Sequence, residues 1–275
     1  MADQSLTLPS PAKINLMLHI VGKRPDGYHN LQTVFQFLSV GDILTFKLAD
    51  DIQVQGNIEN IALEDNLIFK AAQLLKQATG CTQGVHIHLE KRIPMGSGLG
   101  GGSSNAATTL IALNRLWELN LTKAQLLPLA RKLGADVGIF IYGHAAFAEG
   151  IGDEFTPVEP PAPWYVILVP PVHVSTLAIY RHPHLIRNTP LIRSEDYLYY
   201  LGNNDFSPLV CQEYPEIKQA LHWLCQFGKA YLTGSGAGLY LPCQNQAQAQ
   251  DIVGQIPSGM IGFAAQGQNH SPLIF

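Results

Sequence analysis

The residues best suited to chemistry in this chain lie in one glycine-rich stretch, Pro94-Met95-Gly96-Ser97-Gly98-Leu99-Gly100-Gly101-Gly102-Ser103-Ser104. Its glycines carry no Cβ, so main-chain N–H groups can approach a ligand closely. An apolar strand pattern precedes the stretch and a helix pattern over residues 105–119 follows it. The N-terminus of a helix presents unpaired N–H groups and a partial positive charge. This arrangement suits a polyphosphate and indicates an enzyme that uses ATP.

Five further residues with polar groups stand in patterns that predict a site. Lys13 and Asn15 alternate with apolar residues along a strand over 12–20, so they share one face about 7 Å apart. A solvated strand edge is the alternative for this pair. Asp136 has small and apolar neighbours, which predicts burial, and a buried carboxylate is costly unless it is paired or used. Tyr28 and His29 follow a Pro-Asp-Gly turn, and loop residues of this kind often contact ligands.

The elements that must position these residues form an α+β pattern. Further strands are predicted over 43–48, 85–89, 165–169 and 262–265, and helices from an N-cap at Asp65 to 78, over 122–134, 194–201, 215–227 and 246–256. Ser103 or Ser104 is a suitable N-cap for the helix after the glycines. Pro128 predicts a kink or a later start in the helix that contains it. A second glycine cluster lies at 233–238.

The chain of 275 residues is 47% hydrophobic and 14% charged, with a net charge of −4, as in a soluble globular protein. This charge gives no reason to expect nucleic acid. We find no basic, apolar leader and no apolar run long enough for a bilayer, and the four scattered cysteines favour reduced thiols. These features predict a cytoplasmic protein. Four prolines within 157–163 predict a stiff connector and a domain boundary that divides the chain into 1–156 and 157–275.

Other phosphate-binding loops compete for the glycine stretch. No lysine follows the glycines, which excludes a Walker A loop, and the protein-kinase motifs are absent from the sequence. Residues 96–101 formally satisfy the dinucleotide-binding pattern, but Glu118, the acid nearest to the required spacing, falls in a helix pattern. A tight structural turn is the remaining alternative. His86 and His88 share a strand face, where exposure to solvent is favoured over metal binding, and we predict no protein metal site.

The glycine stretch resembles the central motif of the GHMP small-molecule kinases, which include galactokinase, homoserine kinase and mevalonate kinase. Residues 11–16 and 26–29 are similar to the first motif of one member of that family, and so are the segments 134–137, 187–190, 204–205 and 232–237. The combination is specific, whereas each segment alone is not. Ser97 and Gly238 depart from residues that relatives often carry there.

The resemblance implies a two-domain α+β fold, with an N-terminal ribosomal-S5-domain-2-like half and a C-terminal ferredoxin-like half. The active site would lie in the cleft between them. The implied reaction transfers the γ-phosphoryl group of ATP, with Mg²⁺, to the 2-hydroxyl of a cytidine diphosphate alcohol in isoprenoid precursor synthesis. Other GHMP substrates, a dinucleotide-dependent oxidoreductase, and a non-catalytic nucleotide-binding member remain alternatives. A monomer or weak homodimer with no membrane partner is expected.

The same resemblance implies roles for individual residues. Asp136 would act as general base, with Lys13 as its charge partner. The substrate would contact Asn15, Tyr28, His29, Thr176 and Tyr180, with Tyr28 and Tyr180 stacking on the cytosine. The nucleotide would contact Asn66, Lys91, Asn105 and the whole stretch Pro94, Met95, Gly96, Ser97, Gly98, Leu99, Gly100, Gly101, Gly102, Ser103 and Ser104.

Overall fold

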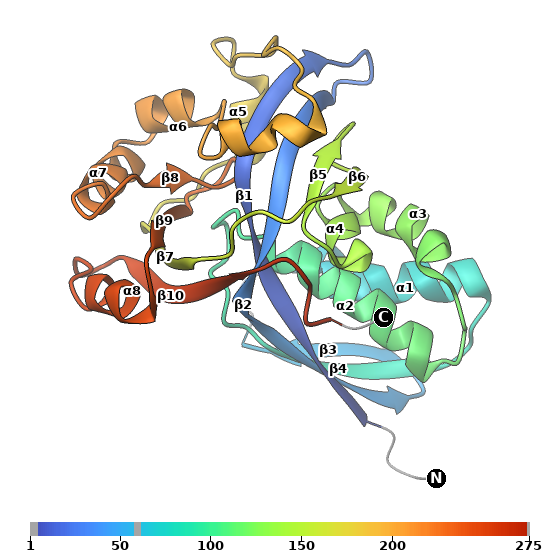
Figure 1. The fold of residues 1–275 in the computed structure, drawn as a ribbon. Helices are drawn as coiled ribbons and strands as arrows, with labels where there is room; N and C mark the ends of the chain where they lie inside the picture. The colour runs from blue at the N-terminus through green and yellow to red at the C-terminus, as the bar shows by residue number, and fades with distance from the viewer. Residues whose placement is uncertain (1–4, 58–61, 274–275) are drawn as a thin grey trace.

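The computed structural model describes residues 5–57 and 62–273 (Figure 1). The elements up to the proline-rich connector are β1 (Ser5–Lys23), β2 (His29–Ala49), β3 (Ile52–Gly56), the 3₁₀ helix η1 (Leu63–Asp65), α1 (Leu67–Thr79), β4 (Gly84–Glu90), α2 (Gly101–Leu116), α3 (Lys123–Leu133), α4 (Val137–Tyr142), β5 (Ala146–Glu149) and β6 (Glu154–Pro157). Beyond it lie β7 (Trp164–Val169), α5 (Thr176–Arg181), the 3₁₀ helix η2 (Ser194–Tyr200), α6 (Ser207–Glu213), α7 (Pro215–Leu224), β8 (Tyr231–Leu232), β9 (Leu239–Cys243), α8 (Gln246–Val253) and β10 (Ile261–Gln268).

The long strand β2 joins the two halves of the molecule. β1 pairs antiparallel with β2 from Ser5 opposite Lys47 to Lys23 opposite His29, with irregularities near Lys13 and Asn15. β4, β10 and β5 also pair antiparallel with β2, at successive segments along it. In the C-terminal half, β10 and β9 flank β7. Through β10, one continuous sheet reaches from β3 to β8.

Two apolar cores lie against this sheet. Helices α1 to α4 pack on β2 and β4 around Phe35, Phe37 and Phe46, which are almost fully buried. The other core joins the apolar side chains of β1 to β7, β9 and helices α6 to α8. β1 therefore contributes to the second core while its polar residues, Lys13 and Asn15, remain available for a site.

Several predicted boundaries are wrong by a few residues. α1 has Asn66, not Asp65, as N-cap, and its side-chain Oδ1 accepts from Ile68 N–H. α2 starts at Gly101, with Gly100 as N-cap, so neither Ser103 nor Ser104 caps it. The predicted helix from Thr122 to Gly134 is confirmed as α3, with Thr122 as N-cap and Gly134 as C-cap, and it runs through Pro128 without the later start that the proline suggested. α7 ends at Leu224, before Gly228.

No helix among the described residues is both long and apolar enough to cross a bilayer. The connector over 157–163 does lie between β6 and β7, on the path from one core to the other. The boundary between 156 and 157 stays a prediction.

Candidate active site

A cavity of about 580 Å³ opens between the two halves. Its lining comes from β1, the glycine stretch, the start of α1, the residues before α4, and the C-terminal half at Thr176, Tyr180, Phe206, Gly234 and Ser235. The cavity contains residues separated by more than 200 positions in sequence, which only the β1–β2 platform and the C-terminal core bring together.

The glycine stretch wraps around the side chain of Lys13. Gly100 has φ of 74°, and a Cβ there would lie 2.9 Å from Lys13 Cγ and 3.0 Å from Phe140 Cζ. Lys13 N–H also donates to Leu99 O at 2.9 Å. Glycine at position 100 is therefore required both by its backbone angle and by the lysine that packs on it.

The second glycine cluster holds the first in place. Gly238 N–H donates to Ser97 O at 2.9 Å, and a Cβ at Gly238 would collide with that carbonyl. Ser97 Oγ donates to Pro94 O at 2.7 Å. The absence of a side chain at Gly238 thus permits a direct contact between the backbones of the two loops.

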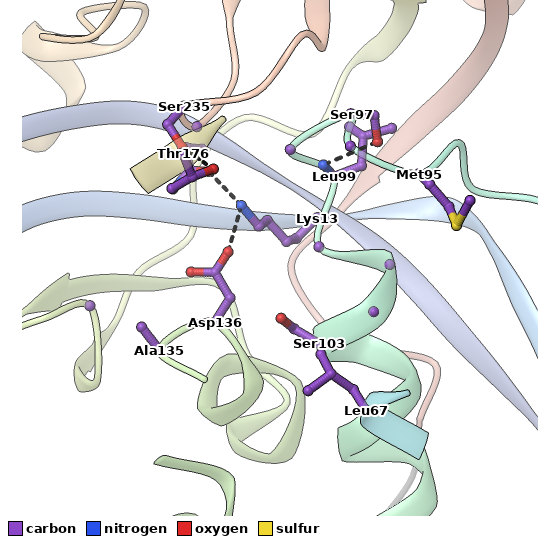
Figure 2. Close-up of a pocket in the computed structure, with 18 of the residues that line it drawn as sticks. Lys13, Leu67, Met95, Ser97, Leu99, Ser103, Ala135, Asp136, Thr176 and Ser235 are labelled. Atoms are coloured by element: carbon purple, nitrogen blue, oxygen red, sulfur yellow. Dashed lines mark hydrogen bonds and ion pairs between the residues drawn. The ribbon is translucent and has the colours of Figure 1, made fainter. Parts of the chain in front are cut away.

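The N-terminus of α2 points its first N–H groups at this cavity. Gly101, Gly102 and Ser103 occupy the first helical positions, and no side chain caps the helix. The N–H groups of a first helical turn have no intrahelical acceptor, so they are available to an anion. Figure 2 shows Ser103 on this turn, facing the space beside Asp136.

Lys91 lies behind this turn and is held by a buried acid. Its Nζ donates to Asp42 Oδ2 at 2.8 Å, and also to Ile93 O. Burial lowers the pKa of Lys91, while the hydrogen bond to Asp42 opposes that change. Lys91 is therefore held in a fixed position, with its charge balanced by the carboxylate of Asp42.

Lys13 and Asp136 meet inside the cavity, as Figure 2 shows. Lys13 Nζ lies 3.1 Å from Asp136 Oδ2 and donates to Asn15 Oδ1 at 2.7 Å. The lysine side chain is 3% exposed and the aspartate side chain 39% exposed. The prediction that Asp136 is buried is thus wrong: its carboxylate stands at the cavity surface, where a hydroxyl group can reach it.

Asn15 is locked by bonds to two other segments. Its N–H donates to Thr233 Oγ1 at 2.8 Å and its Nδ2 donates to Thr33 Oγ1 at 2.8 Å. This leaves the side-chain oxygen of Asn15 directed at Lys13. The alternative of a solvated edge for Lys13 and Asn15 is wrong, since they are only 2% and 4% exposed.

An aromatic group closes one side of the cavity. The rings of His29 and Tyr180 lie 5.1 Å apart, and Tyr180 also packs edge-on against Phe206. Arg187 Nε donates to His29 Nε2 at 3.0 Å, so this nitrogen is an acceptor and His29 is neutral. Burial, with the positive charges of Arg187 and Lys23, lowers the pKa of His29.

Most of the predicted site residues line the cavity. They are Lys13, Asn15, Asn66, Lys91, Asn105, Asp136, Thr176, Tyr180 and the stretch 94–103. Tyr28 does not line it and is 60% exposed, and His29 stands behind Tyr180. Ser104 is fully buried, where its Oγ accepts from Ser10 Oγ at 2.8 Å.

Sequence reasoning missed several lining residues, among them Thr33, Phe35, Phe206, Gly234 and Ser235. Thr33 and Phe35 carry no signal in the sequence, because only the register of β2 on β1 brings them to Asn15. The cluster at 233–238 did carry one, since a second glycine-rich stretch marks a place where another backbone approaches closely. Ser235 Oγ donates to Thr176 Oγ1 at 3.1 Å.

The sequence matches two family descriptions: "GHMP kinases N terminal domain" over residues 66–144 and "GHMP kinases C terminal" over 190–262. Two similar curated proteins are each called "4-diphosphocytidyl-2-C-methyl-D-erythritol kinase". The one from Marinobacter nauticus is 50% identical, covering 98% of this chain and 96% of its own length. The one from Pseudomonas syringae pv. syringae is 49% identical, covering 99% and 98%.

A crystal structure of 4-(cytidine 5'-diphospho)-2C-methyl-D-erythritol kinase is similar to this chain with a TM-score of 0.83 and 32% identity, covering 96% of this chain and 99% of its own. The dinucleotide hypothesis is wrong, because Glu118 follows helix α2 directly and no parallel strand intervenes. The cavity, its glycine loop and these matches agree: the chain belongs to the GHMP kinase family, among relatives named 4-diphosphocytidyl-2-C-methyl-D-erythritol kinase.

Proposed function

We propose that this chain is an ATP-dependent small-molecule kinase that phosphorylates the 2-hydroxyl of 4-diphosphocytidyl-2-C-methyl-D-erythritol and releases ADP. The reaction belongs to the non-mevalonate route to isoprenoid precursors. Relatives near 50% identity over almost the whole chain carry the name of this enzyme. The observation that carries the proposal is the contact between Lys13 and Asp136 beside the uncapped start of α2.

Asp136 serves the acceptor alcohol in this proposal. A tertiary hydroxyl is a weak nucleophile, and a carboxylate within hydrogen-bond reach orients it and accepts its proton, which is worth about 10²–10⁴-fold in rate. Lys13 Nζ lies 3.1 Å from that carboxylate and holds it in position beside the alcohol. The same ammonium group stabilises negative charge on the reacting phosphoryl oxygens.

The nucleotide lies against the glycine stretch. The free N–H groups at the start of α2 would hold phosphate oxygens, with Lys91 and Asn66 near the adenosine end. Mg²⁺ accompanies ATP in the proposal and neutralises phosphate charge. Such an ion is commonly held by phosphates, water and one or two protein oxygens. The Ser103 hydroxyl lines the cavity and is placed to supply one such protein oxygen, whereas the Ser104 hydroxyl is hydrogen-bonded to Ser10.

The substrate occupies the side of the cavity formed by Asn15, Thr176 and Tyr180. Tyr180 provides a ring for the cytosine, since aromatic stacking is worth about 1–3 kcal/mol per base. His29 does not touch the substrate in this arrangement; it contacts Tyr180 and Arg187 and so holds the Tyr180 ring in position. Exposed Tyr28 would have to fold over the bound base to form the other half of the predicted sandwich. We infer a cytoplasmic monomer or weak homodimer.

A coupled assay of ADP release tests this function. The purified chain is given ATP and Mg²⁺ with the cytidyl substrate, mevalonate, homoserine or galactose in separate reactions. We expect turnover with the cytidyl substrate alone. Equal or greater turnover with another alcohol would contradict the substrate assignment, and ATP binding without turnover on any of them would indicate a non-catalytic member.

A further inference from the structure

Two histidines and a glutamate gather on the surface outside the kinase cavity. His144 follows α4, Glu159 lies in the proline-rich connector, and His270 follows β10. One ligand atom from each side chain lies within 4.8 Å of the other two. None of the three lines the cavity described above. Within residues 5–57 and 62–273, no other three histidine, cysteine or acidic side chains come together in this way.

The backbone places the two histidines face to face. His144 and His270 form an antiparallel bridge. It is flanked by hydrogen bonds from Ala145 N–H to Asn269 O at 2.7 Å and from Ser271 N–H to Gly143 O at 3.0 Å. The bonds lie on either side of the histidines, which makes them a non-hydrogen-bonded pair, the arrangement with the shortest separation between facing side chains. Their ring centroids are 4.3 Å apart.

Glu159 lies on the segment that pairs with the other side of the His144 segment, away from His270. Val158 N–H donates to Ala145 O at 3.1 Å, which continues the β5–β6 pairing as far as the connector. Glu159 therefore lies next to His144 on one side, as His270 does on the other. Two neighbouring strands of one hairpin and a third segment more than 100 residues later in the sequence each present one ligand.

A chain of hydrogen bonds through Asn269 orients the carboxylate of Glu159. Asn269 Nδ2 donates to Glu159 Oε2 at 2.8 Å and to Pro160 O at 2.9 Å. Asn269 is itself held by Gln36 Nε2, which donates to its Oδ1 at 2.8 Å. The other carboxylate oxygen, Glu159 Oε1, lies 3.9 Å from His270 Nε2. A partner that fixes one carboxylate oxygen and leaves the other toward neighbouring imidazoles is the arrangement that orients metal ligands.

From these contacts we propose that His144, Glu159 and His270 bind one divalent cation of the Zn²⁺ class, with water at the fourth position. Two imidazole nitrogens and one carboxylate oxygen are a ligand set that Zn²⁺ favours, while Mg²⁺ prefers oxygen ligands throughout. Ligand distances of about 2.0–2.2 Å require the three atoms to close in slightly. The side chains of Glu159 and His270 are 66% and 67% exposed and can rotate to do so.

The ion has a structural consequence for the chain. It ties the connector, the segment before β5 and the segment after β10 to one another. Both the connector and β10 carry the chain between the two cores. Metal binding thus stabilises the junction between the halves, and it does so without contact with ATP or the alcohol.

Calorimetric titration of the chelator-treated, full-length chain with Zn²⁺ tests the site, with Co²⁺ absorption as a second readout of ligand geometry. We expect one Zn²⁺ per chain, a tetrahedral Co²⁺ spectrum, and no competition from excess Mg²⁺. His144→Gln, Glu159→Gln and His270→Gln should each weaken Zn²⁺ binding about tenfold or more. Zn²⁺ should raise the midpoint of thermal unfolding in the wild type and not in these variants.

The double variant His86→Gln/His88→Gln is the matched control, because it removes another histidine pair from an exposed strand face. It should bind Zn²⁺ like the wild type. The proposal is overturned by the absence of saturable one-to-one binding, by unchanged affinity in the three site variants, or by loss of binding in the control. Circular dichroism checks the fold of each variant. If a histidine variant does not fold, the test rests on Glu159→Gln, which is the mildest change and lies on the surface.

Discussion

At the scale of single residues, the proposed phosphoryl transfer depends on a lysine that is almost fully buried and a carboxylate that is not. Lys13 is fixed by Asn15 and by the backbone of Leu99, and it presents its charge to Asp136. Sequence alternation predicted that Lys13 and Asn15 share a face. It could not predict the exposure of Asp136, because the cavity beside this residue is formed by segments from both halves of the chain.

Lys13→Met tests the charge at this position. Methionine preserves most of the apolar packing against Gly100 and Phe35 but removes the ammonium group. We expect kcat to fall about 10²–10³-fold, the range for the loss of one group that stabilises transition-state charge. Steady-state kinetics give this value, and circular dichroism should show an unchanged fold. A kcat close to that of the wild type would remove Lys13 from the mechanism.

His29 makes stability depend on pH. Burial and neighbouring positive charges lower its pKa in the folded chain, so the folded state binds a proton less readily than the unfolded state. Its stabilising contribution is complete above the pKa of an unfolded histidine, about 6.5, and is lost as pH falls from there through the lower folded value. Urea unfolding from pH 7.5 to 5 should show this decrease.

The variant His29→Gln should have a shallower decrease than the wild type over the same pH range. The control His88→Gln, on the exposed face of β4, should keep the wild-type slope. If His29→Gln and the wild type lose stability in parallel, His29 is not the group responsible.

At the scale of elements, the sequence predicted the strand, the glycine stretch and the helix in their correct order. The start of α2 was placed four residues late, because glycine has a low helix propensity and the serines looked like caps. The same glycines are needed where Ile93, Lys91 and Lys13 pack against the backbone. Such packing between distant segments has no local signal.

Gly100→Ala tests the packing of this loop on Lys13. The positive φ of 74° costs about 1–2 kcal/mol for a residue with a Cβ, and the new Cβ also displaces Lys13 and Phe140. We expect lower stability and a higher KM for ATP. Gly80→Ala is the control: its φ of 69° carries the same strain, but no atom lies within 4 Å of the added Cβ. It should lose stability and keep the KM, and equal KM values in both variants would contradict the model of the loop.

At the scale of the whole molecule, the cavity joins two cores that share one sheet through β10. The family resemblance predicted a cleft between halves, and the lining residues from both halves agree with it. The sequence pattern alone could not place β10, since its pairing with β2 at Gly267 and Leu38 closes a loop of more than 200 residues. A pairing between residues so far apart in the sequence produces no periodic pattern of hydrophobic residues.

Because both halves contribute to the cavity, nucleotide binding should stabilise the molecule as a unit. A non-hydrolysable ATP analogue at 100 times its Kd should raise the free energy of unfolding by about 2.7 kcal/mol. Differential scanning calorimetry should show one transition that moves to higher temperature. Two transitions, of which only one responds to the analogue, would mean that the halves unfold independently.

We propose that Asp136 acts on the acceptor alcohol and not on ATP. The most direct measurement compares Asp136→Asn with the wild type in single-turnover phosphoryl transfer and in ATP binding by calorimetry. We expect a transfer rate lower by about 10²-fold or more with an ATP Kd close to that of the wild type. Transfer at the wild-type rate, or loss of ATP binding in a variant that remains folded, would contradict it.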